Sequence, residues 1–319
     1  MGLSKLDPAE ITSLIEGPLN RDPLLEELES DRPEDIKLST GGYICLVAYW
    51  VFSSDIFDAQ HNIPDIYIFP HHHEILGQFL EEDVQDQISN NPGTLEAITV
   101  LGVWLNDKDR LVNKSASEAP NRDYMSYHHL LTLISVFHPN LRVRNAATVL
   151  AGQILHTAPE DERLAILEDL LENCMFSSLQ AAAVTWLKEE IIAAKKSESA
   201  SKFASPDCLE TLQYTLYPDL TSLKDNDIDA LLEFWAEGSP FYLQAANFAM
   251  FLFSGDLYRG LAPVGMAATI EHRWVEPLLG AAKTMMDALE KREVAVEGHG
   301  ESLMQLDILK DRLGRIQLQ

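Results

Sequence analysis

The segment 138–195 limits the possible folds most, because its apolar residues recur at helical spacing in three successive stretches. Pro139 suits the first position of the first helix, acidic residues open the second, and a serine pair can cap the third. The expected buried stripe of the first helix is Leu141, Ala146, Val149, Leu150 and Ile154. Aligning Leu141 with Leu179 superposes the stripes of the first and third helices at an offset of 38 residues, which indicates an internal repeat.

A repeat of about 40 residues is typical of HEAT-type units, in which a two-helix hairpin buries its apolar side by stacking on its neighbours. The sequence therefore predicts an all-α fold, a HEAT/ARM-like α-solenoid of stacked helical hairpins. The alternative is a closed helical bundle that contains two similar helices, because a solenoid is expected to have at least about three stacked units and one repeat is recognisable.

Composition divides the chain of 319 residues into four regions. Residues 1–38 alternate proline with acidic clusters and are expected to form a loosely packed N-terminal arm. Residues 39–196 form the front half of the helical repeats, in which 40–53 is apolar nearly all round and therefore expected at the centre of the fold. The Ser-rich stretch 197–206 is a predicted linker, and residues 207–319 form the back half.

Helix signals continue on both sides of this linker. In the front half they predict helices over about 92–106 and over 124–137. In the back half, Pro277 is expected to bend a long helix over 265–293. The other predicted helices of the back half span 207–216, 227–235, 240–253 and 300–315.

The charge of the chain limits its partners. The formal net charge is −26 and the pI is about 4.6. Such a charge repels phosphate backbones and anionic lipids, so direct binding of nucleic acid or of a membrane is not expected, and a partner with a basic patch is favoured. The longest apolar runs, 43–52 and 241–253, are shorter than the about 20 residues that a membrane-spanning helix needs.

Cysteine usage indicates a reducing compartment. The three cysteines are irregularly spaced and form no CxxC pair, so neither a disulfide framework nor a zinc finger is predicted. We therefore expect a cytoplasmic protein, with the nucleus as a second location. Cys174 is the candidate redox thiol, because it lies between two helices, where a helix dipole can lower a thiol pKa. Nearby acidic residues and the usual burial of free cysteine favour an inert structural thiol instead.

Two histidine clusters suggest metal sites by composition alone. The run 71–74, HHHE, places successive side chains about 100° apart on a helix, so they cannot converge on one ion. A solvated helix start is the favoured interpretation. The same geometry applies to His128 and His129, of which one is expected to be buried and one exposed. The sequence therefore predicts no metal site and no cofactor.

Two further stretches resemble motifs without predicting chemistry. Asp225, Asp227 and Asp229 imitate the first half of an EF-hand loop, but the required Gly and Glu are both replaced by alanine, so these carboxylates are expected to cap a helix. The stretch 298–302, GHGES, is neither GxSxG nor GxGxxG and is expected to be a loop. With no local pair of nucleophile and base, we expect no enzyme. A hydrolase whose site is assembled from distant histidines and carboxylates is the remote alternative.

Aromatic and arginine side chains, which dominate the hot spots of protein interfaces, are concentrated in 241–274. Phe241, Phe248 and Phe251 share a helix face and are expected in the core. The candidates for an exposed protein-binding surface are Tyr258, Arg259, Arg273 and Trp274.

Residues 166–191 resemble a known family. The run LLENC at 170–174, followed by AAAVTWLKEEI at 181–191, is similar to the fungal YAP-binding proteins, which are grouped with kinetochore Ybp-type relatives and with animal glomulin. The similarity continues upstream over 145–155 and is firm over about 135–195. Known members of this family are considerably longer, which would make the chain comparable to their C-terminal part.

The resemblance implies a HEAT-like helical scaffold without catalysis. Fungal members bind a stress-responsive bZIP transcription factor and support its oxidative activation, whereas glomulin caps the RING subunit of cullin ubiquitin ligases. The expected function is therefore an adaptor in the oxidative-stress response, with a bZIP factor or a thiol peroxidase as partner. The alternative is a glomulin-like inhibitor of a RING subunit. The matching residues Trp186, Leu187 and Ile191 are expected in the core, so no binding residue of the family is carried over.

Overall fold

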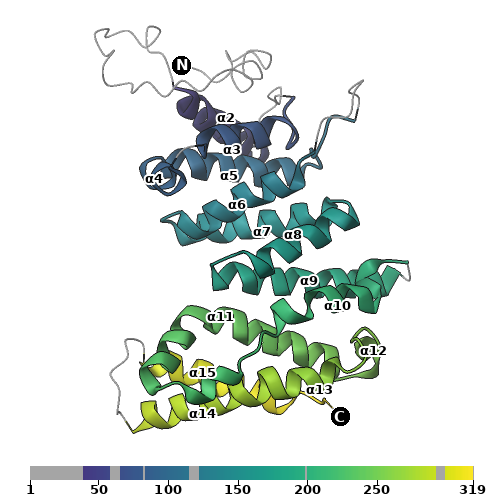
Figure 1. Ribbon diagram of the computed structural model, residues 1–319. Helices are drawn as coiled ribbons and strands as arrows, with labels where there is room; N and C mark the ends of the chain where they lie inside the picture. The colour runs from purple at the N-terminus through teal and green to yellow at the C-terminus, as the bar shows by residue number, and fades with distance from the viewer. Residues whose placement is uncertain are drawn as a thin grey trace, which may run out of the picture. The chain divides into compact units, whose positions relative to one another are not determined.

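The computed structural model describes residues 39–57, 65–81, 83–114, 122–197, 200–291 and 299–318. Every regular element in these ranges is a helix, so the predicted all-α class is confirmed (Figure 1). The predicted N-terminal arm, 1–38, lies outside the described residues. The chain divides into two compact units, Met1–Ala158 and Pro159–Gln319.

The first unit is built from helices that pack against one another in pairs. Helix α6 lies along α7, α5 contacts both α2 and α7, and the short helices α3 and α4 pack on α5 and α6 (Figure 1). Its helices are α2 (Thr40–Phe57), α3 (His71–Phe79), α4 (Val84–Asn90), α5 (Pro92–Asp107), α6 (Tyr124–Phe137) and α7 (Leu141–Thr157).

Helix α2 is less central than its composition predicts. A helix that is apolar nearly all round is expected to be buried on every side. Ile44, Val47 and Val51 are indeed buried, and α2 packs on α5. Cys45 and Tyr49, however, are exposed on another face of the helix. The expectation of complete burial is therefore wrong for this face.

The buried face of α7 differs from the predicted stripe. Leu141 and Val149 are 58% and 57% exposed, so their predicted place in the core is wrong. The helix begins at Leu141, and the preceding Asn140 caps it by accepting a hydrogen bond from Arg142 N at 3.0 Å. The face turned toward α6 and α5 contains small residues, which allow helices to approach closely. The buried residues of α7 are Val143, Ala147, Leu150, Ala151, Gly152, Ile154 and Leu155.

The burial pattern of α7 recurs in α9 (Ser177–Ser197) at an offset other than the predicted one. When Val143 is placed over Leu179, six buried positions of α7 coincide with buried positions of α9, at an offset of 36 residues. Trp186, Leu187 and Ile191 are among them, and their predicted place in the core is confirmed. The internal repeat is thus visible in the burial of side chains, and its extension into a stacked solenoid stays a prediction.

The second unit has a core of long helices. Helix α9 packs on α8 and α11, and α11 packs on α14 and α15, which also contact each other (Figure 1). Its elements besides α9 are α8 (Glu160–Glu172), η3 (Lys202–Ala204), α10 (Pro206–Leu216), η4 (Thr221–Asp225), α11 (Ile228–Phe253), α12 (Asp256–Arg259), α13 (Met266–Ile270), η5 (Glu271–Val275), α14 (Glu276–Glu290) and α15 (His299–Gly314).

Helix α11 is continuous, although the sequence predicts two helices separated near Pro240. Proline cannot donate a hydrogen bond to the carbonyl four residues earlier, which here belongs to Ala236. Ala236 and Pro240 are both exposed, so water can satisfy that carbonyl and the helix continues. Phe241 and Phe248 are buried as predicted, whereas Phe251 is only half-buried.

The described part of the predicted linker is packed against α8 in the second unit. Lys202 N donates to Glu160 Oε1 at 2.6 Å, and Lys202 Nζ lies 2.5 Å from Asp161 Oδ1. Phe203 is buried, and the Arg163 guanidinium lies 5.6 Å from the centre of its ring. These contacts hold residues 200–205 beside the first turn of α8.

A buried histidine organises the core of the first unit. His72 Nε2 lies 2.7 Å from Ile98 O, and Tyr127 Oη lies 2.9 Å from His72 Nδ1. These partners suit a neutral ring that donates from Nε2 and accepts at Nδ1. Burial lowers the pKa of His72 to about 4 and raises the pKa of Tyr127. His72 is only 1% exposed, so the predicted solvated start of α3 is wrong at this position.

Acid is expected to destabilise the protein through His72. Its pKa is about 6.5 in the unfolded chain and about 4 in the folded protein, so the unfolded chain binds more protons between these pH values. The contribution of His72 to the free energy of unfolding is therefore fully present above about pH 6.5. It is lost as the pH falls toward about 4, to a total of about 3 kcal/mol.

Urea unfolding across this pH range measures the loss, and the exposed His129 supplies a matched control. The variant His129→Asn should keep the pH dependence of the wild-type protein, whereas His72→Asn should lose the part that His72 contributes and keep the smaller part from His73, whose pKa burial also lowers. A nuclear magnetic resonance titration of the ring tests the same point without a variant. A His72 ring that titrates near pH 6.5 in the folded protein would contradict the assignment.

Candidate protein-interaction surface

A proline in the second unit determines how η4 lies against α14. Pro277 has no N–H, so it cannot donate to the carbonyl four residues earlier, that of Arg273. Leu220 N donates to this carbonyl instead, at 2.8 Å. The long helix predicted over 265–293 is observed without a break over 266–290, as α13, the π-helical turn η5 and α14. The chain from Leu220 onward is held beside this turn, and η4 packs on α14.

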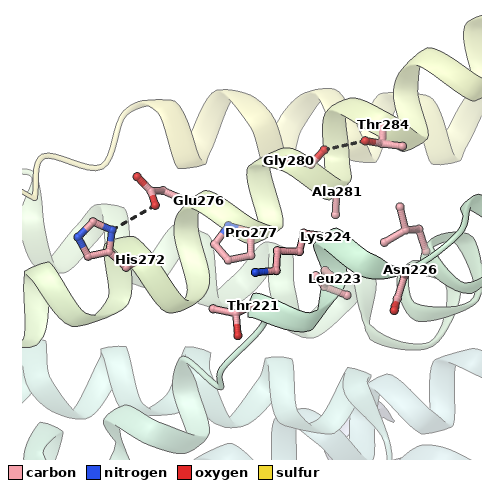
Figure 2. A pocket seen from close by; sticks show the side chains of 11 residues that line it. Thr221, Leu223, Lys224, Asn226, His272, Glu276, Pro277, Gly280, Ala281 and Thr284 are labelled. Carbon is pink, nitrogen blue, oxygen red and sulfur yellow. Dashed lines mark hydrogen bonds and ion pairs between the residues drawn. The ribbon is translucent and has the colours of Figure 1, made fainter.

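A groove of about 500 Å³ lies between η4, the first turn of α11 and α14 (Figure 2). We call it the η4–α14 groove. Leu223, Leu231 and Ala281 are buried side chains that line it. Figure 2 shows Lys224 extending alongside Pro277. The rim is formed by the polar residues Thr221, Asn226, His272, Glu276 and Thr284.

The α14 side of the groove is lined by small and polar residues. A Cβ atom added at Gly280 would have no heavy atom within 4 Å, so this part of the groove is open. Thr284 Oγ1 donates back to Gly280 O at 3.2 Å. His272 Nδ1 lies 3.2 Å from Glu276 Oε2, which joins η5 to the first turn of α14 (Figure 2). The groove therefore offers apolar surface at its floor and hydrogen-bonding groups at its rim.

Acidic residues border the groove where η4 meets α11. Asp225, Asp227 and Asp229 are exposed; the first two flank the lining residue Asn226, and Asp229 lies two positions before the lining residue Leu231. The side chain of Asp227 accepts a hydrogen bond from the third residue of the helix, at 2.9 Å, so the predicted capping role is confirmed for Asp227. The other two carboxylates add negative charge to this border.

Arg273 lies at the surface in a cation–aromatic contact. Its guanidinium carbon is 4.5 Å from the centre of the Tyr214 ring, and its Nη2 donates to Gln213 O at 3.2 Å. Tyr214 is mostly exposed and Arg273 is half-buried. This contact holds the Arg273 guanidinium in one orientation over the Tyr214 ring, and the exposed part of Tyr214 stays accessible to a partner.

Trp274 is not at the surface, contrary to the prediction. Its side chain is 0% exposed and meets the Tyr217 ring edge to face, with 5.1 Å between ring centres. Trp274 follows Arg273 in a helical turn, and successive side chains on a helix point in different directions. The turn therefore places one of the two predicted residues in the core and the other at the surface.

Tyr258 and Arg259 lie on α12, and their contacts differ from those of Arg273 and Trp274 on η5. The centre of the Tyr258 ring is 4.3 Å from the centre of the Phe251 ring. Lys188 Nζ lies over the same Phe251 ring, 4.9 Å from its centre. Arg259 Nη2 donates to Gln317 O at 3.1 Å. Tyr258 and Arg259 are both half-buried. The predicted residues thus belong to two neighbourhoods, one at α12 and one at η5.

Loss of solvation disfavours the thiolate at all three cysteines. It raises the pKa of Cys174, a hydrogen bond from Phe176 N lowers it by less, and the nearby Asp169 raises it again. At the exposed Cys45, partial loss of solvation raises the pKa and a hydrogen bond with Thr94 lowers it by less, whereas burial raises the pKa of Cys208 to about 12. The lowered pKa expected for Cys174 at a helix terminus is therefore wrong in direction.

Cys174 is expected to react slowly with alkylating reagents in the folded protein. Because the thiolate is the reactive form, a raised pKa lowers the rate of alkylation at neutral pH. Iodoacetamide labelling followed by mass spectrometry should show a slower rate at Cys174 than in the urea-unfolded chain at the same pH. Faster labelling of the folded protein, especially below neutral pH, would instead support a redox role for this thiol.

The other motif-like residues show no metal or membrane site in the described part of the chain. Over these residues, no group of three or more His, Cys, Asp or Glu side chains is placed to hold a metal ion. His128 is buried and His129 is exposed, as predicted for this pair. None of the described helices is both long enough and apolar enough to cross a membrane.

The η4–α14 groove was not among the features predicted from the sequence. The available signal was Pro277, which predicts a carbonyl without a helical donor at Arg273. The donor, Leu220, is more than fifty positions away, and no local pattern marks it. The three aspartates beside the groove were recognised, but only as a helix cap.

A helical fold over the described residues, with a cation–aromatic contact at the surface and an open groove, is consistent with a protein-binding role. The chain belongs to the YAP/Alf4/glomulin family, described as an uncharacterised protein family, whose signature matches residues 21–312. The resemblance inferred from the sequence is confirmed, and it extends well beyond 135–195. None of the curated proteins compared with the chain matches it.

Proposed function

We propose that the protein is a non-enzymatic binding scaffold, an adaptor that holds a stress-responsive bZIP transcription factor and supports the oxidative-stress response. The observation that carries this proposal is family membership over 21–312. A thiol peroxidase is the second candidate partner. The adaptor works in the cytoplasm and also in the nucleus, where a transcription factor acts.

Two surface clusters support a binding role. At one, Arg273 lies over Tyr214, and at the other Lys188 lies over Phe251. Arginine and aromatic side chains contribute most to the hot spots of protein interfaces. Both clusters are already ordered in the free protein, which reduces the conformational entropy lost when a partner binds.

The cysteines support a role in which the scaffold positions other proteins. Thiol–disulfide exchange needs an attacking thiolate, and loss of solvation raises the pKa values of Cys45, Cys174 and Cys208. The redox-active thiols of the proposed pathway therefore belong to the bound partners. The scaffold contributes by holding them close together, which raises the effective concentration of one at the other.

Affinity purification with quantitative mass spectrometry, before and after peroxide treatment, tests the proposed partner. The adaptor proposal predicts recovery of a bZIP factor or a thiol peroxidase in an amount that changes with peroxide. Recovery of cullin and RING subunits that is insensitive to peroxide would replace the proposal with the glomulin-like alternative. A panel of hydrolase substrates run on the same preparation should show no turnover.

Alanine variants at the surface clusters test the predicted binding residues. Tyr258→Ala, Arg259→Ala and Arg273→Ala are each expected to weaken binding of the recovered partner by about 1 kcal/mol or more where they belong to a hot spot. Arg315→Ala is the matched control, since Arg315 is exposed just after α15 and pairs with Asp311 in the last turn of that helix at 2.8 Å. If all three variants fold and bind like the wild-type protein, these residues are not the interface.

A further inference from the structure

We propose that the η4–α14 groove binds a cationic amphipathic segment of a partner protein. In this complex an apolar side chain of the segment contacts the groove floor, and its Lys or Arg side chains lie beside the acidic border. The inference rests on the proposed scaffold function for its assignment to a protein partner, and it adds the chemistry of the segment that is recognised.

The shape of the groove suits one apolar anchor and the backbone that carries it. Its volume of about 500 Å³ exceeds that of a single side chain, and its buried lining is apolar, with Leu223, Leu231 and Ala281. Gly280 leaves open space on the α14 side, so a backbone can approach the helix closely there. From Glu276 to Thr284 the groove follows about two turns of α14, or about 12 Å.

The charges around the groove select a cationic segment. Four exposed carboxylates lie on the lining or at the end of the groove where η4 meets α11, and the cations nearby are Lys224 on the lining and Arg273 and Lys283 next to lining residues. The chain as a whole carries a net charge of −26, so an acidic segment is repelled at a distance and a basic one is attracted. The carboxylates are Asp225, Asp227, Asp229 and Glu276.

Polar groups at the rim can fix the position of the segment. The carboxylate of Glu276 is exposed and shared with His272, so it can accept from an incoming Lys or Arg without leaving a buried charge. The side-chain amide of Asn226 and the hydroxyl of Thr221 are on the opposite, η4 side (Figure 2). A segment in the groove therefore meets hydrogen-bonding groups on both sides and apolar surface between them.

A designed peptide tests this proposal on the full chain. The probe is a fluorescent amphipathic peptide of about 15 residues with leucine on one face and lysine on the other, and its partner probe has every lysine replaced by glutamate. Fluorescence anisotropy gives the affinity of each. The first variant, Gly280→Leu, fills the open part of the groove and should fold, because nothing lies within 4 Å of the added Cβ and leucine favours helix.

A pair of charge variants separates the groove from the acidity of the whole surface. Asp225→Lys combined with Asp229→Lys reverses the border and leaves the helix cap at Asp227 intact. The control combines Glu172→Lys with Glu210→Lys, an identical change of charge on α8 and α10, which do not line the groove.

The proposal predicts that the full chain binds the lysine peptide. Gly280→Leu and the border reversal should each weaken this binding about tenfold or more, and the control charge variant should leave it unchanged. The glutamate peptide should bind at least about tenfold more weakly than the lysine peptide. Equal affinity for both peptides, no effect of Gly280→Leu, or an equal effect of the control would each overturn the assignment.

The two proposals fail in distinguishable ways. If the Gly280→Leu chain loses the peptide but recovers a bZIP factor from cells as the wild-type chain does, the groove binds a cationic segment that belongs to another partner. If no bZIP factor is recovered by either chain, the adaptor proposal fails, and the peptide measurements still decide the chemistry of the groove.

Discussion

Replacing Trp274 with alanine is expected to lower the free energy of unfolding by about 3 to 5 kcal/mol, because a fully buried large side chain is removed and a cavity remains. The variant also loses the edge-to-face contact with Tyr217. Trp274 lies in the π-helical turn η5, next to the carbonyl that holds Leu220, so loss of packing should loosen η4 as well. Thermal and urea unfolding followed by circular dichroism measure the effect.

Two further substitutions control for this result. Trp274→Phe keeps an aromatic ring in the cavity and should lose clearly less stability than the alanine variant. Val264→Ala changes an exposed residue of the same unit and should stay within about 0.5 kcal/mol of the wild-type protein. A Trp274→Ala protein as stable as the wild-type protein would mean that this side chain is at the surface, as the sequence first predicted.

Replacing Gly102 with valine is expected to destabilise the first unit by about 3 kcal/mol, through overpacking. A Cβ at Gly102 would lie 2.7 Å from His72 Cε1 and 2.9 Å from Leu150 Cδ2. The His72 ring cannot move aside easily, because it is hydrogen-bonded on both sides, to Ile98 and to Tyr127. Helix α5 must therefore shift away from α3 and α7, and urea unfolding measures the loss.

Gly93 provides the matched control in the same helix. A Cβ at Gly93 would meet no heavy atom within 4 Å, so Gly93→Ala should leave stability unchanged or raise it by up to about 1 kcal/mol. The comparison separates a steric effect at His72 from the general effect of removing a glycine. Gly102→Val with wild-type stability would show that the close approach of α5 to His72 does not occur in solution.

Helix positions were predictable where local signals agree with tertiary packing. The helix predicted over 124–137 matches α6, and the helix that begins after Asp227 has its predicted cap. The break predicted near Pro240 fails because the missing hydrogen bond lies on an exposed face. The buried stripe of α7 was predicted only in part: Leu150 and Ile154 are buried as predicted, but Leu141 and Val149 are exposed, because both faces of this helix carry apolar residues and only the neighbouring helices decide between them.

Functional positions were less predictable, because they depend on contacts between distant residues. Arg273 and Trp274 look equally suited to an interface in the sequence, but the π-helical turn buries one and leaves the other over Tyr214. His72 looks solvated in the run 71–74, but its partners Ile98 and Tyr127 are supplied by other helices. The family, in contrast, was recognisable from residues 145–191 in α7, α8 and α9, and its signature matches residues 21–312.

The binding affinity between the purified full chain and a purified bZIP factor recovered with it tests the scaffold account most directly. Isothermal titration calorimetry should show saturable binding with a defined stoichiometry, and the variant Cys174→Ser should bind like the wild-type chain, because the account assigns no thiol chemistry to the scaffold. Absence of binding to the bZIP factor together with tight binding to a cullin-bound RING subunit would contradict the adaptor function, and loss of binding in Cys174→Ser would contradict a purely positioning role.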